Sequence, residues 1–394
     1  MDVKTIRLTE YKTETYPADF IEEDVAKQIW LRVGSYVDIE QPSWKNDEQW
    51  EFKSKGWVGY IPVDDNLILH LKPKVKIKNI FRMLEYAYRL DFKTYEGLYN
   101  SNSLEEFYEN LAKVLSLKVL DRKRKGLYRE YINRQESLPY VRGRIQFQEM
   151  YKKPWQVRVP NHYQEHTPNI SDNQILAWTL YVILRSGICG DDTTSVVRKA
   201  YRDLQRVVEV GPFSAQDCIN RLYDRLNKDY QPMHALCRFF LDNSGPTIYE
   251  GENEMLPFLI DMSQLYELFV AEWLHEYLPD IYELKSQHIV KFGKGDSFKF
   301  KIDLVIIDPK TREVLYVLDT KYKTPEKPAN PDINQIVAYS EAKGCQQAAL
   351  IYPEEIAYPH IGKIGEIDIR ALTFSTKGDL EEAGEKFLNE LLSE

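Results

Sequence analysis

Apolar and polar residues alternate over much of the first 75 residues, which is the period of a half-buried strand. The clearest case is residues 56–74, where two strands flank a turn at residues 64–66. Leu67, Leu69 and Leu71 share one face of the second strand. A helical pattern interrupts the strands over residues 20–33. We therefore expect a β-rich N-terminal domain over residues 1–95, built as a small barrel or sandwich.

The spacing changes to the helical period at about residue 79, and it stays helical over residues 104–120. A basic stretch follows in which both strands and loops are possible. Further helices are expected over residues 174–184, 194–208 and 217–226. These patterns predict a mainly helical middle region over residues 96–245, ending in an irregular linker at residues 243–257.

Residues 255–394 mix strands with helices, which favours an α/β layer fold and makes the whole chain an α+β multidomain protein. Asp261 is a candidate cap for the first helix, and a turn is expected at Gly293–Gly295. We expect helices over residues 264–278, 332–344 and 379–392, and strands over residues 298–307, 314–323, 348–352 and 367–373.

Composition limits the number of domains and the classes of protein that fit these patterns. The 394 residues, 43% hydrophobic and 29% charged, suit a protein of two or three domains with sizeable cores. No apolar run approaches the ~18 residues of a membrane helix, and the first residues lack the pattern of a secretory signal. We expect a cytoplasmic protein without membrane contact. The four cysteines have no zinc-site or disulfide-framework spacing.

Charge is unevenly distributed along the chain. The net charge of −9 argues against a protein that coats nucleic acid along its whole length. Residues 121–158, however, hold eleven Lys and Arg against four acids, whereas residues 354–394 hold ten acids against four bases. The basic segment 121–158 can grip a phosphate backbone, face an acidic groove on a partner, or be a solvated surface; the sequence leaves these three alternatives open.

Three charged residues near the centre of the C-terminal domain carry candidate chemistry. A hairpin symmetric about Thr311 places Ile307 opposite Leu315 and Asp303 opposite Asp319. Lys321, two residues beyond Asp319, projects to the same face. Two carboxylates held together in a half-buried site need a cation, and Mg²⁺ prefers such oxygen ligands. The lysine can orient water and offset charge on a phosphate, so the three residues predict phosphodiester cleavage.

Polar residues on two helices flank this group. Glu267 lies on the apolar stripe of the first helix, where a carboxylate needs a partner. That partner is either a metal or water, as we expect, or a basic side chain in a buried salt bridge. Gln335 and Tyr339 are four residues apart and share one helical face, which is either part of the site or ordinary polar surface. A D-x-K motif alone is weak evidence; the combination is more specific.

Asp303, Asp319-Thr320-Lys321, Glu267 and Gln335-x-x-x-Tyr339 together resemble the PD-(D/E)xK nuclease superfamily, including its α-β-β-β-α-β core order. The chain departs from the pattern at Ile302, where many members have Pro, and in having Asp rather than Glu as the second acid. The resemblance implies an Mg²⁺-dependent endonuclease. Its metal ligands would be Asp303, Asp319, Thr320 and Glu267, with catalytic roles for these acids and for Lys321, Gln335 and Tyr339.

Other segments resemble the McrC family, the nuclease subunit of the McrBC modification-dependent restriction system. They are Gly56-x-x-Gly59, Leu69-His-Leu-Lys-Pro-Lys-Val75, Met83–Tyr88 and Val141-Arg-Gly-Arg-Ile145. The resemblance implies an N-terminal domain that docks on a McrB-like AAA+ GTPase motor, and double-stranded DNA with methylated cytosine as the substrate. The chain has no G-x-x-x-x-G-K-[S/T] loop, so GTP would be used by the partner.

Two alternatives remain open: a stand-alone nuclease of the same superfamily, and a non-catalytic, motor-activating adaptor. Double-strand cleavage by a subunit with one site would also call for pairing of two nuclease domains.

Overall fold

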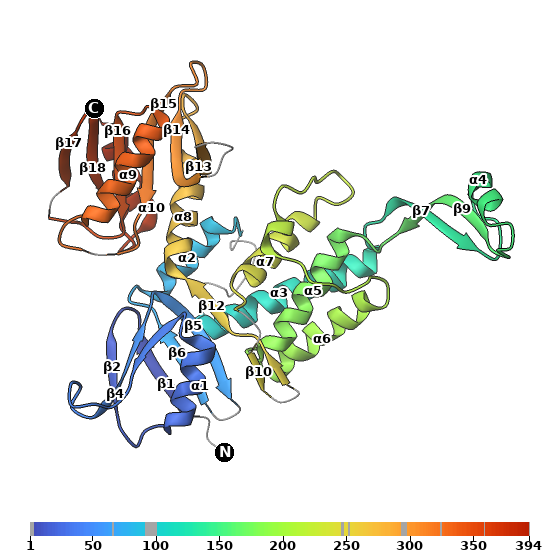
Figure 1. Ribbon diagram of the computed structural model, residues 1–394, viewed down its shortest axis with the longest axis horizontal. Helices are drawn as coiled ribbons and strands as arrows, with labels where there is room; N and C mark the ends of the chain where they lie inside the picture. Colours follow the sequence, from blue (N-terminus) through green and yellow to red (C-terminus); the bar gives the residue numbers. More distant parts are fainter. Residues whose placement is uncertain are drawn as a thin grey trace. The chain divides into compact units, whose positions relative to one another are not determined.

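The computed structural model describes residues 4–64, 67–90, 101–245, 248–250, 253–292, 298–323, 325–357 and 359–393. The chain divides into two compact units, of which unit 1 comprises Met1–Leu104 and Gly245–Glu394 and unit 2 comprises Glu105–Ser244. Both units combine helices with strands, so the chain is a mixed α+β protein as the sequence predicts (Figure 1).

The N-terminal part of unit 1 contains two sheets, with strand orders β1-β6-β5-β12 and β2-β4-β3. β1 runs parallel to β6, and the other pairs are antiparallel. The turn predicted between β5 and β6 includes residues 65–66, which lie outside the described residues. The element bounds are β1 (Lys4–Thr9), β2 (Thr13–Pro17), α1 (Glu23–Val33), β3 (Val37–Glu40), β4 (Gln49–Ser54), β5 (Trp57–Asp64), β6 (Leu67–Lys72) and β12 (Phe258–Asp261).

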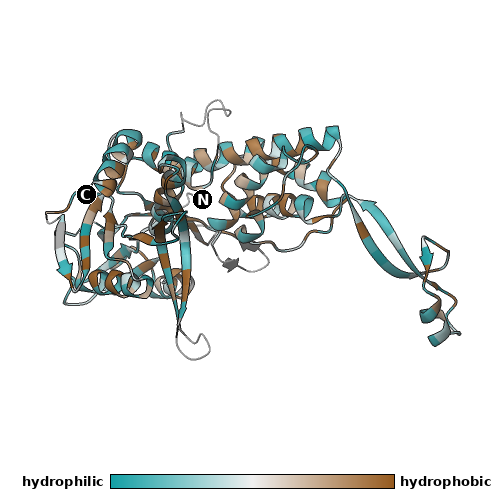
Figure 2. Ribbon diagram, turned by 90° about the horizontal axis from the view of Figure 1, so that it is seen from above, coloured by the Kyte–Doolittle hydropathy of each residue, from teal (hydrophilic) through white to brown (hydrophobic). Residues whose placement is uncertain are grey.

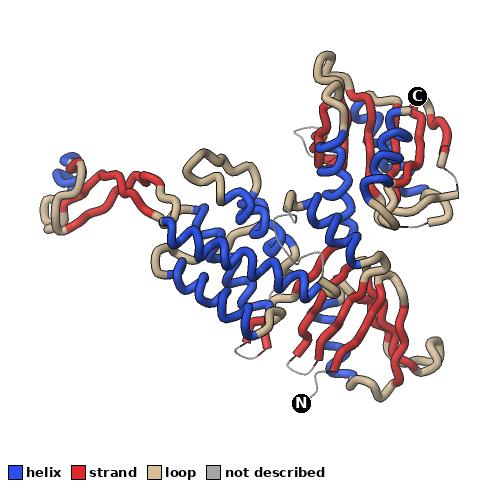
Figure 3. Tube along the Cα trace, turned by 180° about the vertical axis from the view of Figure 1, so that it is seen from behind, coloured by secondary structure: helices blue, strands red, loops and turns tan. Residues whose placement is uncertain are grey.

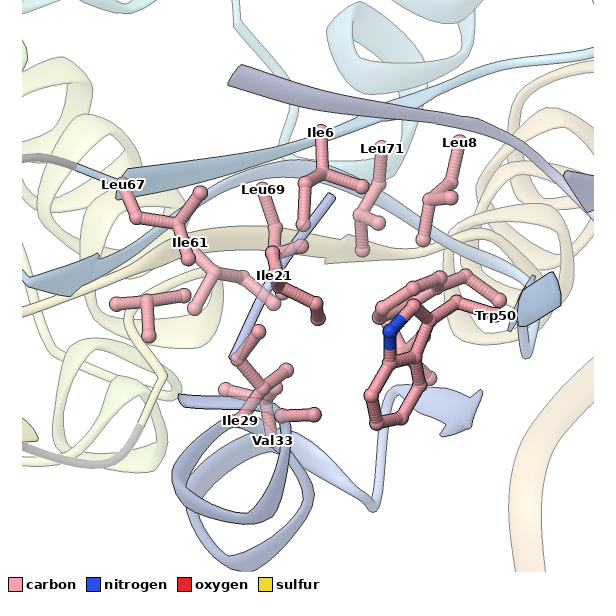
Figure 4. Packing of buried hydrophobic residues seen from close by; sticks show 14 of the residues in the cluster. Ile6, Leu8, Ile21, Ile29, Val33, Trp50, Ile61, Leu67, Leu69 and Leu71 are labelled. Atoms are coloured by element: carbon pink, nitrogen blue, oxygen red, sulfur yellow. The ribbon is translucent and has the colours of Figure 1, made fainter. Parts of the chain in front are cut away.

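One hydrophobic core joins both sheets to α1 (Figure 4). Leu67, Leu69 and Leu71 of β6 are buried in it, as their alternation predicts. Side chains from β1, α1 and β4 complete the cluster, among them Ile6, Leu8, Ile29, Val33 and Trp50. The N-terminal region is therefore a two-sheet structure, as expected, with the helix packed into it.

The segment after unit 2 is more regular than the sequence indicated. Residues 243–257, predicted to be an irregular linker, contain a hairpin of β10 (Ile248–Glu250) and β11 (Asn253–Met255). β12 follows and pairs antiparallel with β5, so it completes the N-terminal sheet. Gly59 of β5 has φ +141°, and a Cβ there would collide with the carbonyl oxygen of Phe258. Glycine is therefore required for β12 to pair at this point.

The C-terminal part of unit 1 is a six-stranded sheet with the order β13-β14-β15-β16-β18-β17. β13, β14 and β15 are antiparallel neighbours, and β15, β16 and β18 are parallel neighbours. The bounds are α8 (Met262–Tyr277), β13 (Glu283–Phe292), β14 (Phe298–Ile307), β15 (Val314–Thr320), α9 (Asn330–Lys343), β16 (Gln347–Tyr352), β17 (His360–Ile364), β18 (Ile367–Thr373) and α10 (Leu380–Leu392).

Most of these elements match the sequence prediction, but two strands were missed, β13 and β17. Asp261 caps α8, since its side chain accepts hydrogen bonds from the backbone N–H groups of Ser263 and Gln264. α9 ends at Gly344, which has φ +63° and serves as the C-cap. The Gly293–Gly295 turn lies outside the described residues.

Unit 2 combines helices with a three-stranded sheet of order β7-β9-β8 (Figure 3). The sequence left strands and loops both possible in the basic segment; the structure forms β7 and β8 there, and β9 follows directly after it. The bounds are α3 (Leu104–Lys125), β7 (Glu130–Leu138), β8 (Arg144–Ile145), α4 (Phe147–Lys152), β9 (Val159–Thr167), α5 (Ser171–Ser186), α6 (Asp191–Gln205) and α7 (Tyr230–Asp242).

The helix predicted over residues 217–226 is wrong. Ser214 and Asp217 form a capping box that serves only a short 3₁₀ turn, Ala215–Cys218. Asn220 then takes φ 56°, which ends any helix, and Arg221 ion-pairs with the buried Asp172. The apolar residues of this stretch do not share one buried face, since Leu222 and Leu226 are exposed.

The β7–β9 ribbon is mostly hydrophilic along its length (Figure 2). Several of its cations are already paired: Arg134 and Arg142 both contact Glu165. Beyond the paired strands, Tyr151, Trp155 and Val157 are 83%, 76% and 93% exposed. Among helices in the described ranges, none is both long and apolar enough to cross a bilayer.

Candidate active site

Strands β14 and β15 bring the predicted acids together. Leu304 pairs with Leu318 and Val305 with Val317, and one step further this register brings Asp303 level with Asp319. The predicted pairing of Ile307 with Leu315 is wrong: an irregularity after Ile306 pairs Ile307 with Val314. The loop between β14 and β15 is therefore one residue shorter than predicted. The pairing of Leu304 with Leu318, next to the acids, is the predicted one.

Thr320 fixes the orientation of the Asp303 carboxylate. Asp303 Oδ2 accepts hydrogen bonds from the backbone N–H of Thr320 at 2.9 Å and from its hydroxyl at 3.0 Å. Both donors come from the end of β15, the strand that carries Asp319. The two strands are therefore linked by side-chain bonds at the level of the acids, and the Thr320 hydroxyl is directed at Asp303.

Asp319 is almost completely buried, with 1% of its surface exposed. Burial raises the pKa of its carboxyl group to about 7, and the nearby Asp303 charge acts in the same direction. Lys321 opposes this effect, with its Nζ 2.5 Å from Asp319 Oδ2. Near neutral pH the protonated and ionised forms of this carboxyl group are therefore both populated.

Lys321 joins the acids to helix α9. Its ammonium group donates to Gln335 Oε1 at 3.0 Å, and Gln335 Nε2 donates to the Tyr339 hydroxyl at 2.7 Å. Burial alone would lower the pKa of Lys321, but the Asp319 charge, assisted by Asp303, raises it above its usual value. The lysine is thus held as an ammonium ion by one carboxylate and one amide oxygen.

Glu267 approaches the same group from α8. Gln287 Nε2 donates to Glu267 Oε1 at 3.4 Å. Burial raises the pKa of Glu267, the Asp303 charge raises it further, and Lys301 opposes both. The structure therefore brings together all six predicted residues: Glu267, Asp303, Asp319, Lys321, Gln335 and Tyr339.

Asp332 is a buried acid that the sequence analysis did not assign to the site. It lies in the first turn of α9, 7% exposed, and its Oδ2 is 2.5 Å from Lys323 Nζ. Its charge raises the pKa of Asp319. One feature of the sequence could have indicated Asp332. Lys323 lies two residues after Lys321 on the same side of an extended chain, so it too needs an acidic partner.

The oxygen donors suit a hard divalent cation. Within the described residues, no three His, Cys, Asp or Glu side chains are grouped closely enough to form a metal cage on their own. Mg²⁺ does not require one, because it is held by one or two carboxylates and keeps several waters. Burial, with the Asp303 charge acting in the same direction, raises the pKa of Asp319 and Glu267, and a bound cation would offset both effects. Asp303 and Asp319 therefore fit this role, with Glu267 close to Asp303.

Comparison with known proteins agrees with this picture. The family model described as McrBC 5-methylcytosine restriction system component matches residues 52–353. The type IV methyl-directed restriction enzyme EcoKMcrBC of Escherichia coli K12 is 23% identical over 278 residues, covering 64% of this chain and 74% of that protein. A half-complex from a tetradecameric assembly of Thermococcus gammatolerans McrB AAA+ hexamers with bound McrC contains a chain of similar fold. That match has 18% identity and a TM-score of 0.55, and it covers 98% of this chain and 99% of the other.

Proposed function

The chain belongs to the family of McrBC 5-methylcytosine restriction system components, and on this basis we propose that it is the DNA-cleaving subunit of such a system. In this proposal its C-terminal domain is a PD-(D/E)xK nuclease that hydrolyses phosphodiester bonds with Mg²⁺. The substrate is double-stranded DNA carrying methylated cytosine. A partner AAA+ GTPase drives cleavage and is stimulated by this chain.

The observation that carries the proposal is the convergence of Asp303, Asp319 and Lys321 at one end of the β14–β15 pair. Structural salt bridges pair one acid with one base. Here a half-buried lysine faces one buried acid, whose pKa is raised by burial and by the charge of a second acid. Such an arrangement is costly to folding unless it serves a cation or a reaction.

The residues divide the work of hydrolysis. Asp303 and Asp319 would hold Mg²⁺, which supplies Lewis-acid activation and a more acidic water. Thr320 keeps Asp303 in place through its two hydrogen bonds. Lys321 orients the attacking water and offsets the charge that develops on the phosphate. Gln335 and Tyr339 hold the lysine, and Glu267 assists by binding water.

The partner is proposed from the relatives. The McrC chain of similar fold is bound to McrB AAA+ hexamers in its structure, and the present chain has no nucleotide-binding loop of the Walker type. We infer that a motor of this kind binds the present chain and that its GTP hydrolysis supplies the energy. The N-terminal two-sheet region remains our proposed docking site.

The test is cleavage of methylated DNA by the full assembly carrying Asp319→Asn. The proposal expects loss of cleavage with the partner's GTPase still stimulated. Normal cleavage by this variant would reject the assignment. Cutting by the isolated chain with Mg²⁺ and without GTP would favour a stand-alone nuclease, and GTPase stimulation without cleavage by the unaltered chain would favour an adaptor.

A further inference from the structure

The Leu69-x-Leu71-x-Pro73-Lys74 segment has a role that the proposed chemistry does not yet use. Leu69 and Leu71 are core residues of β6. Pro73 has no N–H to donate, so the strand ends at Lys72 and the chain leaves the sheet in a fixed direction. Lys74 is the first residue beyond this point, and it contacts the part of unit 1 that carries the candidate site.

Lys74 contacts Tyr322, the residue directly after Lys321. Its Nζ lies 4.5 Å from the centre of the Tyr322 ring and 5.2 Å from that of Tyr11, which are cation–π distances. The Tyr322 side chain is only 4% exposed. A ring buried at this contact has little freedom to move.

Glu10 completes the contact. It is 2% exposed, and its Oε2 accepts hydrogen bonds from the Lys74 backbone N–H at 3.3 Å and from the Tyr322 hydroxyl at 3.4 Å. Its other oxygen, Oε1, is buried and accepts no hydrogen bond from the described residues. A buried carboxylate with so few partners is costly, and the Lys74 charge is what offsets it.

Besides Tyr322, two backbone hydrogen bonds hold the chain at Lys321, and in one of them the Lys321 carbonyl accepts from the Lys323 N–H at 2.8 Å. Strand β15 ends at Thr320, and beyond it Lys321 N–H donates to the Ile351 carbonyl at 2.8 Å. In an extended segment neighbouring side chains point to opposite sides. Lys321 accordingly reaches Asp319, while Tyr322 reaches Glu10. The anchoring of Tyr322 therefore adds a side-chain restraint to these two hydrogen bonds, at the residue next to Lys321.

We propose that Lys74 and Glu10 form a clamp on Tyr322 that sets the position of Lys321, which makes Lys74 a positioning residue for the cleavage reaction. The inference rests on the proposed function of Lys321. It links the N-terminal sheet to the candidate site through three side chains, and it gives the Leu-x-Leu-x-Pro-Lys segment a purpose beyond folding.

The first test measures the clamp without any cleavage, by hydrogen exchange of the backbone amides of residues 320–323. Lys74→Met keeps the apolar stem and removes the charge. We expect exchange about two- to thirtyfold faster, from loss of the cation–π contact. Lys74→Arg should restore protection. Lys72→Met, at an exposed side chain two residues earlier, is the matched control and should leave it unchanged.

The second test measures single-turnover cleavage by the full assembly. Lys74→Met should slow cleavage about ten- to hundredfold by misplacing Lys321, with the KM for DNA and the partner's GTPase unchanged. A merely structural role would instead lower cleavage and GTPase stimulation together.

These outcomes separate the inference from the proposed function. If Asp319→Asn abolishes cleavage but Lys74→Met leaves exchange and cleavage unchanged, the clamp is rejected and the nuclease assignment stands. If Asp319→Asn cleaves normally, the proposed function fails, and the positioning role fails with it.

Discussion

Asp319 shows most clearly how a single residue combines folding cost with function. Its carboxyl group is buried next to a second acid, and its pKa is raised to about 7. A group whose pKa is higher in the folded state stabilises the fold only while it is protonated. That contribution is complete below the unfolded pKa near 4 and is lost as the pH rises through about 7. The ionised form, which the proposed Mg²⁺ site requires, is therefore the destabilising form.

The effect of Asp319→Asn on stability should be more favourable at pH 8 than at pH 5, on top of a pH-independent cost of removing the partner of Lys321. At pH 8 the unaltered carboxyl is ionised in the folded state, and the extra gain for Asn should be on the order of 2 kcal/mol. Urea unfolding in the presence of a chelator measures it. Glu313→Gln, at an exposed acid, is the control; an equal gain at both pH values would contradict the burial argument.

Cleavage should depend on pH and Mg²⁺ together. Because the metal needs ionised carboxylates, the rate should fall as the pH drops below about 7, where Asp319 becomes protonated. Raising the Mg²⁺ concentration should move this acid limb to lower pH. Cleavage rates across pH 5–9 at two Mg²⁺ concentrations measure the effect, and a limb that does not respond to Mg²⁺ would exclude Asp319 as a ligand.

At the scale of elements, the sequence predicted the helices and strands whose apolar residues recur at one regular spacing. The predicted strands and helices around β15, α9 and β18 agree with the structure because their buried faces are regular. β13 was missed because its core-side spacing is interrupted at Gln287, which has φ 49°. The sequence could not decide between strands and loops for the β7–β9 ribbon, because no apolar stripe marks it. Asp332 was missed because its partner lies on another element.

The exposed end of the β7–β9 ribbon favours a surface that faces the partner, among the three alternatives given for the basic segment. Exposed Tyr151 and Trp155 argue against a merely solvated surface, and the pairing of Arg134 and Arg142 with Glu165 leaves less free positive charge for DNA. We expect the double variant Tyr151→Ala and Trp155→Ala to weaken binding of the motor about tenfold or more.

The measurement is GTPase stimulation titrated with this chain, alongside DNA affinity, which should not change. Leu222→Ala, at another exposed apolar residue of unit 2, is the control. Reduced DNA affinity with normal stimulation would instead identify the ribbon as a grip on the phosphate backbone.

At the scale of the whole chain, residues far apart in sequence build one sheet. β12 joins the N-terminal sheet after all of unit 2 and leads directly into α8, which carries Glu267. No local pattern could predict this pairing, because β12 is four residues long and its partner lies about two hundred residues earlier. The only local sign was the Gly56-x-x-Gly59 motif, whose second glycine admits the Phe258 carbonyl.

Gly59→Ala should therefore lower the free energy of unfolding by about 1–3 kcal/mol, because it combines a backbone strain with a clash against β12. Thermal or urea unfolding measures the loss. Gly211→Ala, where a Cβ meets no atom within 4 Å, serves as the control. A loss no larger than that of the control would mean that β12 does not pair as described.

The central claim, that this chain cuts DNA with Asp303, Asp319 and Lys321, is tested most directly by single-turnover cleavage of methylated DNA by the full assembly carrying Lys321→Met. The exposed Lys310→Met is the matched control. We predict that Lys321→Met lowers the cleavage rate by a factor of at least about 10². GTPase stimulation should stay intact, and the control variant should cleave at the unaltered rate. Cleavage by Lys321→Met at the rate of the unaltered assembly would contradict the account.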